Sequence, residues 1–120
     1  MWVNYNANPN NAHVGDCTVR AISEATGKTW ERTFAELCVV SFDLKDMPEA
    51  NRSWGEYLRR CGYKRKIIES NCTVQEFCAE HKNGTFVVAA EGHVICARNG
   101  DFIDTWDSSQ EIALFYWEVI

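Results

Sequence analysis

Residues 84–107 read GTFVVAAEGHVICARNGDFIDTWD and carry the clearest β-sheet signal in the chain. The run from residue 85 to residue 96 is rich in Val, Ile and Phe, side chains that favour extended backbone. Asn99-Gly100 follows, and this dipeptide between apolar runs is the strongest short-range signal for a two-residue hairpin turn. Residues 102–106 supply the returning strand. The stretch therefore predicts an antiparallel hairpin.

The two-residue turn fixes which side chains share a face of this hairpin. Because side chains alternate along a strand, the register places five residues on one face: His93, Ile95, Phe102, Asp104 and Trp106. Asp104 lies diagonal to His93 across the two strands, and Trp106 faces His93. Asp107 points to the opposite face, so Asp104 is the expected partner of His93. The register thus predicts a carboxylate within reach of an imidazole, beneath an indole ring.

Two helices are predicted in the first half of the chain from apolar spacing and from their end signals. The first covers residues 17–26, with Asp16 as its N-cap and Gly27 as its stop. The second begins near Thr29 and places four apolar residues on one buried face: Trp30, Phe34, Leu37 and Cys38. Residues 42–52 form the longest predicted loop, which we expect to border a cleft.

Two further helices open with capping boxes, in which a Ser or Thr is followed three residues later by a Glu. Residues 53–56 (SWGE) start the third helix, which ends at Gly62 and buries Trp54, Tyr57, Leu58 and Cys61. Residues 73–76 (TVQE) start the fourth helix, which aligns Val74, Phe77, Cys78 and His81. Cysteines on such apolar stripes are expected to be buried structural thiols: Cys38, Cys61 and Cys78.

The order of these elements defines the fold class. Helices come first and an antiparallel sheet follows, with residues 112–119 as the last strand and residues 63–69 as a candidate edge strand. This order predicts the α+β class, with N-terminal helices packed on a C-terminal antiparallel β-sheet. A chain of 120 residues can bury one core without metal or disulfide staples, so residues 1–120 are expected to form a single domain.

Composition limits the partners and the compartment. The net charge of −5 lacks the basic excess that phosphate binding needs, so no nucleic-acid partner is expected. No apolar run reaches the length of a membrane span, and residues 1–16 lack the features of a secretory signal, which predicts a cytoplasmic protein without a membrane partner. The six cysteines show neither regular spacing nor a CxxC pair, so we expect free thiols, no metal and no cofactor.

Cys17 is the best candidate for a nucleophile near His93. A thiol at a helix N-terminus lies at the positive end of the helix dipole, and an approaching imidazolium lowers its pKa further. Asp104 then holds one nitrogen of the His93 ring and leaves the other to exchange a proton with the thiol. Asp16 opposes thiolate formation unless its charge is occupied in capping or paired with Arg20. These residues predict a Cys-His-Asp triad for nucleophilic catalysis.

Three short motifs follow one another along the chain: Gly15-Asp16-Cys17 at a helix start, Gly92-His93 on a later strand, and Asp104-Thr105-Trp106. Their order resembles that of the papain-like cysteine peptidases. Residues 84–107 also look similar to the corresponding part of compact bacterial and phage members of the bacteriocin-leader peptidase type. The resemblance implies a papain-like fold and a cysteine peptidase acting on a peptide or protein substrate. It also implies that Asn11, six residues before Cys17, donates its side-chain amide to the oxyanion hole.

Other functions fit the same residues. The triad also suits acyl transfers that pass through a thioester, such as transglutamination, deamidation or removal of a ubiquitin-like tag. A papain-like fold without catalytic activity, acting as a binding module of phage or mobile-element origin, is a further alternative. His13, four residues before Cys17, is a second candidate base. The sequence does not indicate the substrate, the cleavage specificity or the oligomeric state.

Overall fold

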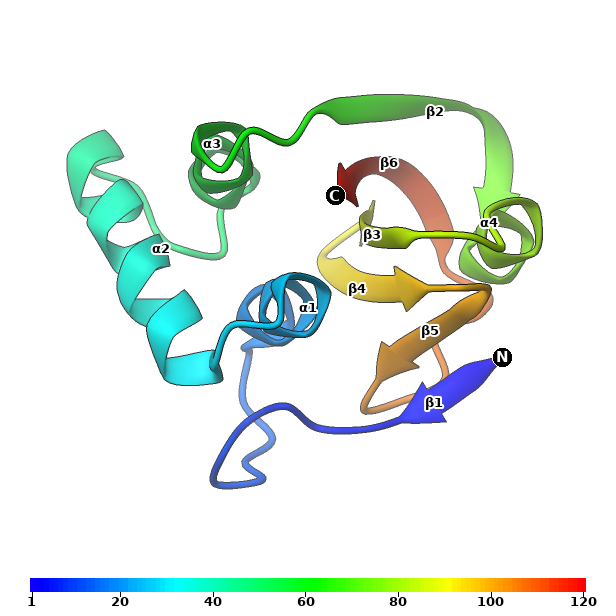
Figure 1. Ribbon diagram of the computed structural model, residues 1–120, viewed down its shortest axis with the longest axis horizontal. Coiled ribbons are helices and arrows are strands. Elements are labelled where there is room, and N and C mark those ends of the chain that lie inside the picture. The colour runs from blue at the N-terminus through cyan, green and yellow to red at the C-terminus, as the bar shows by residue number, and fades with distance from the viewer.

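The predicted hairpin forms in the computed structural model, which describes all 120 residues of the chain (Figure 1). Strand β4 (His93–Arg98) runs antiparallel to β5 (Asp101–Asp104), and Arg98 pairs with Asp101 across the turn. The two turn residues, Asn99-Gly100, adopt positive φ angles of 51° and 88°, which suit a tight hairpin turn. The register inferred from the turn is therefore confirmed for the three pairs nearest the turn, from Arg98–Asp101 to Cys96–Ile103. The returning strand is shorter than predicted, because β5 ends at Asp104 and does not reach Trp106.

Four more strands complete a six-stranded sheet in the spatial order β1-β5-β4-β3-β6-β2. Their bounds are Trp2–Asn4 for β1, Arg65–Thr73 for β2, Thr85–Ala90 for β3 and Ile112–Val119 for β6. Strand β6 matches the predicted last strand, and β2 supplies the predicted edge. The prediction of a wholly antiparallel sheet is wrong, because β1 pairs in parallel with β5. A strand of 3 residues in an Asn-rich segment carries no periodic pattern that would indicate it.

A tight turn at Glu91-Gly92 separates β3 from β4 within the apolar run. Gly92 has a φ of 66°, a backbone conformation that favours glycine. The turn makes His93 the first residue of β4, and the adjacent strand β5 ends at Asp104. The hairpin therefore presents His93 and Asp104 together at one end of the sheet.

The sheet is covered on both faces (Figure 1). Helices α1 (Cys17–Thr26), α2 (Trp30–Leu44) and α3 (Asn51–Arg60) lie on one side, and α4 (Val74–Glu80) lies on the other. The larger core joins the first three helices to alternate residues of β3 and β4: Val87, Ala89, Val94 and Cys96. The intervening residues of the same strands face α4 in a second core, among them Phe86, Val88, Ile95 and Ala97.

The helix ends confirm some of the predicted signals and correct one. Helix α1 has the predicted bounds and ends at Gly27, which has a φ of 76°. The capping box of α4 is formed, since Thr73 and Glu76 each accept a hydrogen bond from the other's backbone N–H. The capping box predicted at residues 53–56 is wrong, because α3 begins earlier, directly after Ala50. The Ser of that motif is buried inside the helix.

Four side chains predicted to be buried are more exposed. Phe34 is 42% exposed, Trp30 and Cys38 are half-buried, and Cys61 is exposed. Helix α2 packs mainly against α1 and α3 rather than on the sheet, so only a narrow stripe of it is covered: Thr33, Leu37, Val40 and Ser41. Cys61 follows the last residue of α3 and turns to the surface. Cys78 is buried, as predicted.

The loop predicted over residues 42–52 is shorter than expected, because α2 continues to Leu44 and α3 begins at Asn51. Pro48 and Glu49 in this loop line a cavity beside α1, so its predicted position at a cleft is confirmed. No helix in the structure has both the length and the apolar character needed to cross a membrane.

Candidate active site

Cys17 and His93 are brought together by the packing of α1 on β4. Cys17 is the first residue of α1 and His93 is the first residue of β4, and both elements contribute to the larger core. The two residues line one cavity of about 260 Å³, together with Gly92 and Val94. The predicted nucleophile and the predicted base therefore lie in one site, although they are far apart in the sequence.

The imidazole of His93 is held by Asp104. Nε2 of His93 lies 2.6 Å from Oδ2 of Asp104, in a short hydrogen bond. The His93 side chain is 10% exposed and that of Asp104 is 2% exposed, so the bond is shielded from water. It occupies Nε2 and leaves Nδ1 as the ring nitrogen available to the thiol. The contact predicted from the hairpin register is present.

Neighbouring groups hold this pair in place. The Ser108 hydroxyl donates to Oδ2 of Asp104 at 2.7 Å, and the backbone N–H of Thr105 donates to Oδ1 at 2.8 Å. The ring centroid of Trp106 lies 4.8 Å from that of His93, so the indole packs against the imidazole. Sequence reasoning predicted Trp106 but missed the buried Ser108, because Ser108 lies beyond the hairpin whose register could be inferred.

The pKa values of the triad residues are displaced in the directions that an activated thiol needs. Burial acts to raise the pKa of Cys17, but hydrogen bonds with His93 and with the backbone of Val94, and the charge of His93, lower it below its ordinary value. Burial acts to lower the pKa of His93, but its bonds to Asp104 and Cys17 raise it to about 9. Burial acts to raise the pKa of Asp104, but hydrogen bonds with His93 and Ser108 lower it. These shifts favour a thiolate beside an imidazolium.

Three other thiols are displaced in the opposite direction. Burial raises the pKa of Cys72, raises that of Cys78 to about 11 and raises that of Cys96 to about 12. All three lie in the apolar cores of the molecule. A reagent that selects for thiolates therefore distinguishes Cys17 from these cysteines.

Asp16 does not cap α1 with its side chain, which corrects the prediction. Its buried carboxylate accepts hydrogen bonds from Nε of Arg20 at 2.8 Å, from Nε1 of Trp30 at 3.0 Å and from Nδ2 of Asn8 at 3.1 Å. These three donors occupy the oxygens that a cap would use. The pairing with Arg20 meets the condition under which a thiolate can form beside Asp16.

Arg20 also reaches the triad. Its Nη1 lies 3.3 Å from Oδ1 of Asp104 and 3.4 Å from Oγ1 of Thr105. The spacing of four residues between Asp16 and Arg20 indicated the first contact of this guanidinium. No pattern in the sequence indicated the second, because it joins α1 to the end of β5.

The N-terminal end of α1 has no side-chain cap, because the Asp16 carboxylate is turned toward Arg20. The backbone N–H groups of residues 17–19 have no partner within the helix. They point out of the end that carries Cys17 and lie at the positive end of the helix dipole. Such N–H groups are suited to stabilising an oxyanion that forms on a carbonyl attacked by Cys17.

Asn11 is not among the residues that line the cavity of Cys17 and His93. It is exposed and has a positive φ of 53°, and its backbone N–H donates to the carbonyl of Asn8. Asn8 is the buried amide of this segment and binds the Asp16 carboxylate. The structure therefore places Asn11 on the surface and not among the residues of this cavity.

His13, the second candidate base, is also exposed. It lines a separate cavity of about 260 Å³ with Arg20 and Trp106, and that cavity does not include Cys17. The structure therefore brings His93, and not His13, into the cavity of the thiol.

Comparison of the chain with models of known protein families, with characterised proteins and with solved structures gives no match. No three or more His, Cys, Asp or Glu side chains are grouped so that they could hold a metal ion. The chemistry of this protein is therefore inferred from the geometry of the site itself.

Proposed function

We propose that this protein is a papain-like thiol hydrolase that cleaves a peptide or isopeptide bond. The observation that carries the proposal is the cavity shared by Cys17 and His93, together with the 2.6 Å bond from His93 to the buried carboxylate of Asp104. A thiol at a helix N-terminus, an imidazole beside it and a carboxylate behind the imidazole supply a nucleophile, a general base and a group that orients the base.

In the acylation step, the Cys17 thiolate attacks the substrate carbonyl carbon, and an S–C bond forms while the carbonyl π electrons move to oxygen. The backbone N–H of Cys17 donates to this oxyanion, and the resemblance assigns the Asn11 amide as a second donor. The carbonyl re-forms as the C–N bond breaks. His93 gives its proton to the departing amine, which leaves a thioester on Cys17.

In the deacylation step, neutral His93 takes a proton from water as the water oxygen attacks the thioester carbonyl. The C–S bond then breaks, the acid product leaves and Cys17 is again a thiolate beside protonated His93. Asp104 holds the ring in one orientation throughout, because its carboxylate accepts from Nε2. Trp106 limits the access of water to that bond, since its ring packs against the imidazole.

A peptide library incubated with the purified protein tests the proposal, with cleavage products identified by mass spectrometry. We expect Cys17→Ala and His93→Ala each to lower turnover on the order of 10³-fold or more while leaving the fold intact. Cys61→Ala is the matched control, because Cys61 is an exposed cysteine outside the site. Full turnover by Cys17→Ala would exclude this mechanism.

The same experiment separates acyl transfer from hydrolysis. When a primary amine is added, a transferase converts the thioester into an amide of that amine, whereas a hydrolase releases the acid, and the two products differ in mass. Absence of cleavage and of amide formation, together with an unreactive Cys17, would identify a binding module instead.

A further inference from the structure

A large groove lies between α3 and the start of the edge strand β2. It has a volume of about 820 Å³, within the range of roughly 300–1,000 Å³ typical of ligand pockets. Four basic side chains and one acidic side chain line it: Arg52, Arg59, Lys64, Arg65 and Glu56. We call it the basic groove.

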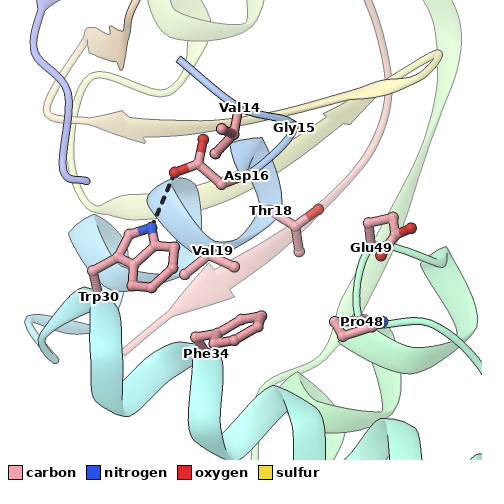
Figure 2. Close-up of a pocket in the computed structure, with 9 residues that line it drawn as sticks. All are labelled: Val14, Gly15, Asp16, Thr18, Val19, Trp30, Phe34, Pro48 and Glu49. Atoms are coloured by element: carbon pink, nitrogen blue, oxygen red, sulfur yellow. Dashed lines mark hydrogen bonds between the residues drawn. The ribbon is translucent and has the colours of Figure 1, made fainter. Parts of the chain in front are cut away.

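The charge of the basic groove is opposite to that of the whole chain. Its lining carries an excess of three positive charges, whereas the chain has a net charge of −5. The cavity beside α1 that Pro48 and Glu49 line, drawn in Figure 2, has two acidic side chains in its wall and no basic one. The positive charge of the basic groove is therefore a local feature, which attracts anionic groups.

Two of the four cations have no carboxylate partner. Lys64 and Arg65 are exposed and form no ion pair, and the Arg65 guanidinium lies 5.3 Å from the centroid of an aromatic ring, a contact that does not neutralise its charge. Arg59 is bound by both carboxylate oxygens of Glu56, at 2.7 Å each. Arg52 lies 3.7 Å from an Asp carboxylate. Lys64 and Arg65 are therefore the cations that are free to pair with an anionic ligand.

The lining of the basic groove also holds an unused hydrogen-bond donor. Nε1 of Trp117 has no hydrogen-bond partner in the protein, although Trp117 is only 6% exposed. Gly55 lies against this ring, because a Cβ at Gly55 would be 3.5 Å from Cζ2, which lies on the N–H side of the indole. A buried N–H without an acceptor is unfavourable, and a carboxylate oxygen supplies an acceptor.

The shape of the basic groove distinguishes between kinds of anion. Asn51, Gly55 and Arg59 all line it and are spaced four residues apart, so they lie along one side of α3. The distance along the helix from Asn51 to Arg59 is about 12 Å, at a rise of about 1.5 Å per residue. An extended peptide of about four residues has this length, whereas a single phosphate fills a small part of it. The groove therefore fits an extended acidic peptide better than a compact anion.

We propose that the basic groove binds an acidic segment of a polypeptide, with carboxylates of the segment paired to Lys64 and Arg65. Binding at this site does not require the triad, so the inference does not depend on the proposed function of Cys17. Asn51 lines both the basic groove and the cavity of Cys17 and His93. A segment bound in the groove therefore lies next to that cavity.

Fluorescence anisotropy with labelled peptides tests the proposal. The probes are a hexa-Glu peptide and a hexa-Gln peptide, which have nearly the same size and differ in charge. We expect the protein to bind hexa-Glu at least about 10-fold more tightly than hexa-Gln at low ionic strength, and added salt to reduce this difference. Cys17→Ala should bind hexa-Glu with the wild-type affinity, because the thiol is not part of the groove.

Charge-reversal variants then locate the binding. Lys64→Glu and Arg65→Glu should each weaken binding of hexa-Glu by about 5-fold or more, because each replaces an attraction with a repulsion. Both side chains are exposed, so the fold should be retained, and circular dichroism checks this. Lys82→Glu is the matched control, since Lys82 is also exposed and does not line the groove. It makes the same change in net charge and should weaken binding by less than about 2-fold.

Three results would overturn the proposal. Equal affinities for hexa-Glu and hexa-Gln would show that the groove does not select acidic peptides. Equal weakening by Lys64→Glu and Lys82→Glu would show that the peptide responds only to the overall charge of the protein. Displacement of hexa-Glu by inorganic phosphate, but not by chloride at equal ionic strength, would assign the groove to a compact phosphate instead. Selective binding of hexa-Glu by a protein whose Cys17 is unreactive to iodoacetamide would support the groove and overturn only the proposed function.

Discussion

Nη1 of Arg20 lies 3.3 Å from Oδ1 of Asp104, the carboxylate that also binds His93. The same guanidinium bonds to the buried carboxylate of Asp16 through Nε, so one cation joins two anions beneath the site. Arg20 therefore connects the start of α1, where Cys17 lies, to the end of β5. It is a positioning residue, because it reaches the thiol and the imidazole through other groups.

Removal of the Arg20 charge should alter the pH dependence of activity. The charge of Arg20 contributes to the lowered pKa of Cys17. In Arg20→Gln that pKa rises, so the acidic limb of kcat/KM moves to higher pH. Arg20→Lys keeps the positive charge, so its acidic limb of kcat/KM should lie close to the pH of the wild-type limb. An identical pH profile for Arg20→Gln and the wild-type protein would contradict this role.

Loss of the Asp16 carboxylate should destabilise the fold. Asp16 is 6% exposed and neutralises Arg20 while accepting from Trp30 and Asn8. Asp16→Ala leaves a largely buried guanidinium without this partner, and we expect a loss of roughly 3 kcal/mol in the free energy of unfolding. Urea denaturation measures it. Glu56→Ala, which breaks exposed ion pairs, is the control and should shift the midpoint far less; equal shifts would contradict the expectation.

Asp104 should set the alkaline limit of activity. The pKa of His93 is raised from 6.5 to about 9, partly by its bond to Asp104. Imidazolium is needed to protonate the leaving amine, so kcat/KM should fall as pH rises through about 9. Asp104→Ala removes this support and should shift the alkaline limb to lower pH, with a loss on the order of 10²-fold in kcat. Asp104→Asn, whose amide oxygen can still accept from Nε2, should lose less. An unshifted alkaline limb in Asp104→Ala would exclude the orienting role.

The same pair predicts a pH dependence of stability. The folded-state pKa of His93 lies above its unfolded value of 6.5, so the stabilisation by protonated His93 is complete below pH 6.5 and is lost as pH rises through about 9. As pH rises from 6.5 to about 9, the thermal unfolding temperature should fall more for the wild-type protein than for His93→Ala. Parallel curves for the two proteins would contradict the shift.

The proposed oxyanion role of Asn11 can be tested against its neighbour. Removal of one oxyanion donor typically lowers kcat on the order of 10²-fold or more. We expect Asn11→Ala to show such a loss and Asn10→Ala, another exposed Asn of the same segment, to retain activity. Small and equal effects would remove Asn11 from the mechanism and leave the backbone N–H groups of α1 as the donors.

Turn and helix-end residues correctly predicted the features of the fold that depend only on neighbouring residues in the sequence. The Asn99-Gly100 turn fixed the register of the hairpin, and alternation along the strands then placed His93 and Asp104 together. Trp106 packs on His93 as expected, although it lies beyond the end of β5. Gly27 ended α1 where expected, because its left-handed backbone stops a helix. Helix α1 also begins at Cys17 as predicted, although Asp16 does not cap it with its side chain.

Features that depend on distant partners were missed. Asp16 was predicted to cap α1, but its carboxylate instead accepts hydrogen bonds from Trp30 and Asn8. No local pattern in the sequence indicates these two donors. Strand β1 forms by pairing with the edge strand β5, which is distant in the sequence. Phe34 is exposed because α2 packs mainly against α1 and α3 and not on the sheet. One contact of Arg20 could be predicted and the other could not. Asp16 lies four residues before Arg20, a spacing that predicts contact on a helix, whereas Asp104 is distant in the sequence.

The central claim is that Cys17 and His93 form a reactive thiolate-imidazolium pair, and alkylation by iodoacetamide tests it most directly. The rate of labelling of Cys17 is measured relative to that of exposed Cys61 from about pH 5 to about pH 9, with peptide mass mapping to identify each site. We expect the ratio of the Cys17 rate to the Cys61 rate to increase as pH falls in the wild-type protein. In His93→Ala this increase should be absent. A ratio that does not change with pH, or that is the same in His93→Ala, would contradict the account.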